Sequence, residues 1–264
     1  MIAVSSFVMM AVCALLGFGL PVALAWWLVK KRHAKPETIV IGAGIFILFA
    51  LVLESLVHQV VLKGPSGEAI LGNIWYYALY GGSMAALFEE GGRFLAMKYL
   101  LKKETAGALP GIAYGIGHGG AEMLVLFGVG MISNIVLGVL INSGQADILL
   151  ASAPAEAQEQ VQAQFAQLQT LSAGSMLLGL WERISALVLQ LGLSIIVWTA
   201  VRCGGKWLWL LAGAFLLHFL VDAIVVVLAK SADMVVVEVV VSALAIAIGT
   251  IGWKLAQSLK ATAE

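Results

Sequence analysis

Charged side chains are scarce in this chain of 264 residues, because only 11% are Asp, Glu, Lys or Arg. Soluble domains average about 25%, so the composition excludes an ordinary soluble globular domain. The formal net charge is +0, which excludes a bulk electrostatic attraction for nucleic acid. Apolar residues make up 61% of the chain. We therefore expect a multi-span protein whose main partner is the lipid bilayer, and no nucleic-acid partner.

Cysteine and the features of a secretory signal are also scarce. The two cysteines, Cys13 and Cys203, are too few for a disulfide framework. The first apolar run, residues 5–29, has neither a basic n-region nor a small-residue cleavage site. It is long enough to cross a bilayer, so we predict that it is the first membrane helix.

Long apolar runs predict an all-α bundle of about seven transmembrane helices, because about 20 mostly apolar residues cross a bilayer. We expect one polytopic domain over residues 1–264, with spans at 5–29, 38–62, 73–101, 108–141, 175–201, 207–229 and 234–257. The fourth span is too long for a perpendicular helix. We expect it to tilt, to break at a glycine or to extend past the bilayer.

Lysine and arginine gather on one side of the predicted membrane, as they do in cytoplasmic loops. That side holds Lys30, Lys31, Arg32, Lys35, Lys98, Lys102, Lys103, Arg202, Lys206, Lys254 and Lys260. Only Lys63 and Lys230 fall on the other side. We predict an inner or plasma membrane protein with its N-terminus outside and its C-terminus in the cytoplasm.

The longest loop, residues 142–174, would lie on the outer face. Its stretch 156–169 is rich in helix formers, and Val161, Phe165 and Leu168 recur at spacings of four and three. Two interpretations stay open. One is an amphipathic helix that lies on the membrane or caps the bundle, and the other is a solvated acidic connector.

Three groups of ionisable residues lie inside the predicted spans. They are Glu89-Glu90-x-x-Arg93, His118-x-x-x-Glu122 and His218-x-x-x-Asp222. Ionisable groups at mid-membrane are costly and rare, and they mark functional sites by default. One member of each group lies 10 or 11 residues from the cytoplasmic end of its span, which is roughly 15–17 Å deep. We therefore expect one intramembrane site.

Helical spacing predicts which of these side chains share a face. Residues four apart do so, and each histidine therefore points the same way as the acid of its own group. Glu89 and Arg93 are also four apart, which predicts an ion pair between them. Glu90 points about 100° away from Glu89, so we predict that Glu90 is the working carboxylate.

Other polar residues lie in the outer half of the predicted spans. For Glu54, His58, Glu182 and Arg183 we favour one structural network, because buried ions must find partners. The functional alternatives are a second layer of residues that supports the site, or a substrate gate. Glu238, near the outer end of the last span, is expected to be satisfied or to face water.

The three groups, in this order and on membrane helices, resemble the motifs of the YhfC family of intramembrane metalloproteases. They are more distantly similar to PrsW proteases and to the CAAX-prenyl and bacteriocin-processing proteases. The matching segments are Glu89-Glu90-Gly-Gly-Arg93, Gly115-Ile-Gly-His118-Gly-Gly-Ala-Glu122 and His218-Phe-Leu-Val-Asp222, with Glu182-Arg183 resembling a further pair. The likeness extends from about the second span onward.

The resemblance implies that the residues of the three groups are catalytic and hydrolyse a peptide bond of a membrane-anchored protein or peptide. It implies that Glu90 activates water with help from His118, while His218 and Asp222 hold the oxyanion. Two functions remain as alternatives. A Glu/His/Asp cluster also serves proton- or ion-coupled transporters, although we find no inverted repeats, and an inactive relative would only bind peptides.

A zinc ion is compatible with the same residues. His118, Glu122 and His218 could hold a catalytic Zn²⁺ with an open water position, whereas a metal-free glutamate mechanism needs no further residue. The chain lacks the His-Glu-x-x-His motif of zinc metalloproteases. Gln190 lies at the depth of the three groups, where the resemblance implies a histidine.

Overall fold

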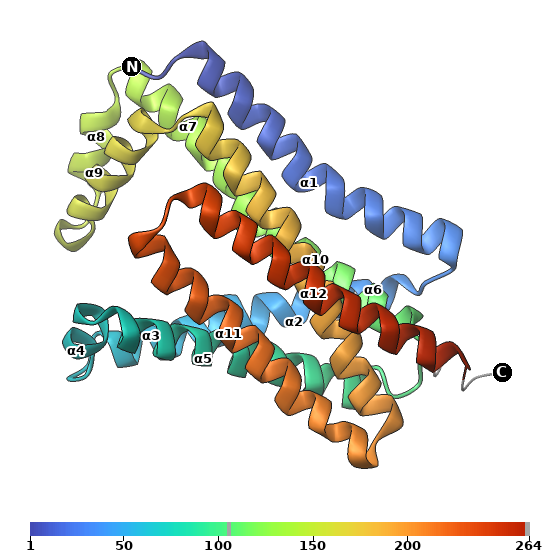
Figure 1. Ribbon diagram of the computed structural model, residues 1–264. Helices are drawn as coiled ribbons and strands as arrows, with labels where there is room; N and C mark the ends of the chain where they lie inside the picture. The colour runs from blue at the N-terminus through green and yellow to red at the C-terminus, as the bar shows by residue number, and fades with distance from the viewer. Residues whose placement is uncertain (105–106, 262–264) are drawn as a thin grey trace.

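The computed structural model describes residues 1–104 and 107–261, and every regular element within those ranges is helical. The predicted all-α class is therefore confirmed. Figure 1 shows long helices side by side, with the start of the first helix and the described end of the last helix at opposite ends of the bundle. An odd number of membrane crossings would place these two helix ends in this way.

The N-terminal half holds the first four predicted spans. Its elements are α1 (Val4–Arg32), α2 (Pro36–Phe46), η1 (Ile47–Glu54), α3 (Ser55–Leu62), α4 (Gly67–Gly72), α5 (Ile74–Leu95), η2 (Ala96–Leu100), α6 (Leu109–Glu122), η3 (Met123–Val129) and α7 (Gly130–Asn142). The segments η1, η2 and η3 are π-helical and each continues a longer helix. The short α4 was not predicted.

The C-terminal half holds the outer loop and the last three predicted spans. Its elements are α8 (Ala146–Ser152), α9 (Ala155–Thr170), α10 (Ala173–Cys203), the 3₁₀ turn η4 (Gly205–Leu208), α11 (Trp209–Ser231) and α12 (Met234–Ala261). Within the described residues, six helices are long and apolar enough to cross a membrane. The helix α5, which carries Glu89, Glu90 and Arg93, corresponds to the third predicted span and is not among those six helices, although it has 22 residues.

The outer surface of the bundle is apolar, as a lipid-facing surface requires. Leu15, Trp209 and Ile246 are 73%, 81% and 62% exposed. A soluble monomer rarely exposes apolar side chains over so wide an area. The chain is therefore a multi-pass membrane protein, while its orientation and its single-domain organisation stay predictions.

The fourth predicted span neither breaks nor stops at a glycine. Residues Leu109–Asn142 form one continuous helix of 34 residues. Pro110 occupies its first turn, where a missing N–H costs nothing. The π-helical segment η3 lies between α6 and α7. The helix departs from regular α-helical geometry there but does not end.

Glycine lets the helices around the centre of the bundle approach to backbone distance. A Cβ atom on Gly42 of α2 would lie 2.3 Å from the carbonyl oxygen of Tyr114 in α6. A Cβ atom on Gly82 of α5 would lie 2.8 Å from the carbonyl oxygen of Phe219 in α11. Small residues at such contacts allow close packing between membrane helices. These two close helix–helix contacts, which we call seams, set the rotation of α5, α6 and α11 about their axes.

The long loop that was predicted to lie on the outer face folds against the end of the bundle. Helix α9 covers the predicted stretch and contacts α7. Phe165 and Leu168 are buried at 9% and 4% exposure, and Leu168 joins a core cluster with Met10 of α1 and Met176 of α10. The amphipathic helix that caps the bundle is therefore confirmed, and the solvated connector is wrong.

Candidate active site

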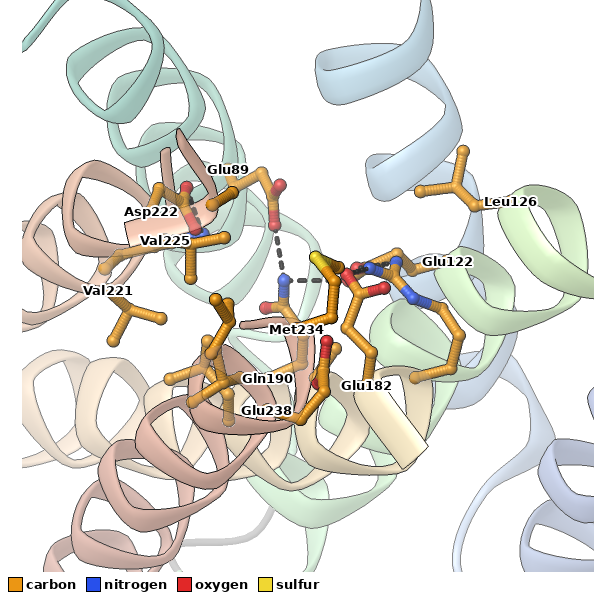
Figure 2. A pocket seen from close by; sticks show the side chains of 17 residues that line it. Glu89, Glu122, Leu126, Glu182, Gln190, Val221, Asp222, Val225, Met234 and Glu238 are labelled. Carbon is orange, nitrogen blue, oxygen red and sulfur yellow. Dashed lines mark hydrogen bonds and ion pairs between the residues drawn. The ribbon is translucent and has the colours of Figure 1, made fainter. Parts of the chain in front are cut away.

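A cavity of about 320 Å³ lies between α5, α6, α10, α11 and α12. Figure 2 shows its lining, which brings together side chains from the three motif helices and from α10. Its polar lining consists of Glu89, Glu122, Glu182, Arg183, Gln190, His218, Asp222 and Glu238. Carboxylates therefore dominate a pocket inside the membrane-spanning bundle.

The side-chain amide of Gln190 is the centre of the network. Its Nε2 donates to Glu89 Oε2 at 2.8 Å and to Glu122 Oε2 at 2.9 Å, as the dashed lines in Figure 2 mark. Its Oε1 accepts from Arg93. One neutral side chain thus links α5, α6 and α10, and it fills three of its hydrogen-bonding positions in doing so.

The predicted ion pair between Glu89 and Arg93 is wrong. Arg93 is fully buried and donates to Glu90, three residues before it, and to Gln190. Side chains three apart on a helix are neighbours just as those four apart are, so spacing alone could not choose the partner. Glu89, not Glu90, faces the cavity.

His118 binds the carboxylate of Glu89. Its Nε2 lies 2.9 Å from Glu89 Oε2, and because an ionised carboxylate only accepts, the proton of that bond is on Nε2. The imidazole is fully buried, with Tyr114 stacked at 5.9 Å between ring centroids and Phe46 edge-on at 5.2 Å. His118 therefore orients Glu89 without lining the cavity itself.

His218 and Asp222 occupy the wall contributed by α11. His218 Nδ1 lies 2.8 Å from Glu90 Oε1, and its Nε2 lies 3.5 Å from Asp222 Oδ2. The second distance is too long for a good hydrogen bond. Burial also differs, since the Asp222 side chain is 33% exposed and that of His218 only 3%. The imidazole is thus fixed at Nδ1, and its Nε2 is left for the cavity.

Arg183 links two carboxylates of the cavity lining. It donates to Glu122 Oε1 at 3.0 Å and also to Glu182. The predicted network of four outer residues is therefore wrong, because it divides in two. Glu54 makes its hydrogen bonds apart from this network, with His58 3.1 Å from Glu54 Oε1 and 2.9 Å from the hydroxyl of Tyr80, although its charge interacts with those of Glu89 and Asp222.

Every residue of the three predicted groups thus enters this network of hydrogen bonds and ion pairs. The sequence did not predict the hydrogen bonds that Gln190 and Arg183 make in this network. The depth of Gln190 was a signal for its contacts, since Gln190 lies on α10 level with the motif residues. No signal in the spacing linked Arg183 to Glu122 on another helix.

The predicted zinc ligands do not assemble. In the described part of the chain, no three His, Cys, Asp or Glu side chains are grouped so that they could hold a metal ion. His118 binds Glu89, His218 binds Glu90, and Glu122 binds Arg183 and Gln190. Histidine, arginine and amide donors therefore engage these carboxylates, and the ligand set His118, Glu122 and His218 does not fit a metal as it stands.

Comparison with known proteins agrees with the motifs. The family model described as YhfC intramembrane metalloprotease matches residues 13–241. A curated relative, the "Uncharacterized membrane protein YhfC" of Bacillus subtilis (strain 168), is 38% identical over 204 residues, which is 76% of this chain and 78% of the relative. No solved structure gives a significant match.

Proposed function

The chain belongs to the YhfC family of intramembrane metalloproteases, and from this membership and the cavity we propose that it hydrolyses a peptide bond of a membrane-associated protein or peptide. The observation that carries the proposal is the setting of Glu89. This carboxylate lines the cavity, and His118 and Gln190 both bind its Oε2 atom. Its Oε1 atom is the one left to take a proton.

Glu89 acts as general base and then as general acid. Oε1 takes a proton from a water molecule while the water oxygen bonds to the scissile carbonyl carbon. The carbon–nitrogen bond then breaks, and Glu89 returns the proton to the leaving amine nitrogen. The two hydrogen bonds to Oε2 hold the carboxylate in one orientation through both transfers.

His218 stabilises the oxyanion that forms when water adds to the carbonyl. Its Nδ1 is held by Glu90, which Arg93 holds in turn. An imidazolium fixed in this way presents its Nε2–H to the cavity, where a donor aimed at developing negative charge lowers the barrier. Asp222 lies beside that nitrogen, with its Oδ2 atom 3.5 Å away.

This assignment revises the roles that the sequence predicted. Glu90 was expected to be the base, but it is engaged by Arg93 and His218. It is a positioning residue that orients the oxyanion donor. Glu89 takes the place of the base because its carboxylate is the one that faces the cavity.

The family description implies a metal, but the proposed steps use none because the ligands are not grouped. Elemental mass spectrometry of the purified chain tests this directly, with a His118→Ala/His218→Ala double variant beside it. Substoichiometric zinc in both proteins is expected. Near one zinc per chain, lost in the double variant, would show that the histidines rearrange around a metal and would overturn the metal-free steps.

The proposed activity is tested with purified protein in detergent. Fluorescein-labelled casein and a mixture of labelled single-span peptides are the probes, and new N-termini are read by mass spectrometry. The wild-type chain should cleave, Glu89→Gln should lose at least about 100-fold, the low end for removal of a general base, and exposed Glu68→Gln should match the wild type. Equal cleavage by Glu89→Gln and Glu68→Gln would refute the role of Glu89.

A further inference from the structure

The end of the cavity on the predicted outer side contains a carboxylate oxygen that has no hydrogen-bond partner among the described residues. Glu238 of α12 is 3% exposed, and its buried Oε2 atom makes no hydrogen bond within the described residues. Figure 2 shows Glu238 directed into the cavity beside Glu182 and Met234. Of the two sequence-based expectations for Glu238, a satisfied group or one that faces water, the first is not met for Oε2 within the described residues, and the second stays a prediction.

The charges around Glu238 do not balance. The cavity is lined by five carboxylates, Glu89, Glu122, Glu182, Asp222 and Glu238. The one arginine in the lining, Arg183, is already shared between two of them, and His218 is bound to Glu90. A buried carboxylate without a partner is costly. A cation brought by a ligand would remove that cost, which makes this end of the cavity selective for positive charge.

The position of this acidic end along the bundle says which part of a substrate it would meet. Glu238 lies four residues after Met234, the first residue of α12, and thus about 6 Å from that helix end. Glu182 lies nine residues into α10, about 14 Å from the start at Ala173. Both helix starts belong to the predicted outer side. The acidic end therefore lies on the outer side of Glu89.

We propose that Glu238 and Glu182 form a subsite for a positively charged group on the outer side of the scissile bond. The group is an ammonium or guanidinium, supplied either by a Lys or Arg side chain or by the free amino terminus of a peptide. The proposal deepens the proposed hydrolase function and rests on it for the meaning of the scissile bond. A cation there would bind the unpartnered Oε2 and balance the acidic lining.

The test separates binding from cleavage. Two fluorescent single-span peptides differ only at the outer flanking position, where one has lysine and the other norleucine, and both are acetylated at the amino terminus. A third peptide has norleucine and a free amino terminus close to the flank. Binding is measured by fluorescence anisotropy with Glu89→Gln protein in detergent, which removes turnover. The lysine peptide should bind roughly tenfold more tightly, as expected for a hydrogen bond to a charged group.

Variants then assign the preference to residues. On the Glu89→Gln background, Glu238→Gln should bring the lysine-to-norleucine ratio close to one, Glu238→Asp should keep it above one, and Glu68→Gln should leave it unchanged. A free amino terminus that matches lysine would identify the terminus as the source, and one that matches acetylated norleucine would identify the side chain. An unchanged ratio in folded Glu238→Gln, or equal binding of all peptides, would overturn the subsite.

Cleavage by the wild-type chain distinguishes the two proposals. Cleavage of both acetylated peptides at equal kcat/KM would keep the hydrolase and remove the subsite. A lysine preference in binding, without cleavage of any peptide, would keep the cation subsite and remove the hydrolase. Apparent melting temperatures of the variants check that each is folded before its ratio is used.

Discussion

Replacing Gly42 with alanine should force α2 away from α6 and disturb the candidate active site. The new Cβ atom would lie 2.3 Å from the carbonyl oxygen of Tyr114 and 3.0 Å from the backbone nitrogen of His118. Ordinary van der Waals contact begins at 3.4 Å, so the two helices must separate by about 1 Å. Both contacts are with backbone atoms, which no side-chain rotation can relieve.

The cost follows from two opposing effects. Overfilling a packed interface costs about 1–3 kcal/mol, while alanine in place of glycine favours a helix by up to about 1 kcal/mol. With the full gain in helix propensity, the net destabilisation is roughly 0–2 kcal/mol. Activity should fall further, because a displacement of about 1 Å at a catalytic group costs about 100-fold, and His118 holds Glu89.

Gly44 supplies the matched control within the same helix. It lies two residues from Gly42 in α2, and a Cβ atom there would have no atom within 4 Å. Gly44→Ala has the same gain in helix propensity without the clash. Apparent melting temperature in detergent, read by a thiol-reactive fluorophore, should fall by roughly 5 °C between Gly44→Ala and Gly42→Ala. Equal melting temperatures and equal peptide cleavage would refute the argument that this seam positions the site.

Substitutions at three other positions separate the parts of the network. Gln190→Leu should lower the apparent melting temperature by the equivalent of roughly 3 kcal/mol, because it removes three buried hydrogen bonds to charged groups at about 1 kcal/mol or more each; an unchanged temperature would contradict its central place. Arg183→Leu should cost about 3–5 kcal/mol by leaving Glu122 without its cation, and Arg183→Lys should recover part of that loss in the same assay. Glu54→Gln should keep peptide cleavage within about threefold of wild type, since its hydrogen bond to His58 lies apart from this network; a loss as large as that of Glu89→Gln would extend the site to Glu54.

The helices were predictable because the bilayer sets their length. Apolar runs of about 20 residues mark membrane spans, and the predicted boundaries fall within a few residues of α1, α10 and α12. The convergence of the three motif groups was also predictable, since equal depth in the membrane restricts where costly ionisable groups can find partners. Depth is a one-dimensional property that the sequence records directly.

The rotation of each helix about its axis was not predictable. Glu89 and Glu90 are adjacent and diverge by about 100°, so the choice between them depends on how α5 is turned. That rotation is set by contacts such as Gly82 against Phe219 and Gly92 against the ring of Phe49, which join residues far apart in sequence. The hydrogen bonds of Gln190 were not predictable either, because its depth in the membrane does not say which side chains of other helices an uncharged amide will bind.

The π-helical segment η3 divides one long helix into two angular registers. In a π-helix each N–H binds the carbonyl five residues back instead of four, so η3 takes up an extra residue between α6, which carries Glu122, and α7, which contacts α1 and α9. Deleting one residue from η3 would turn α7 by roughly 100° relative to α6. The face of α7 that now meets α1 would then point elsewhere, although no side chain of either helix had changed. The additional residue thus sets the direction of Glu122 on α6 separately from the direction of the α7 face that packs against α1, within one continuous helix.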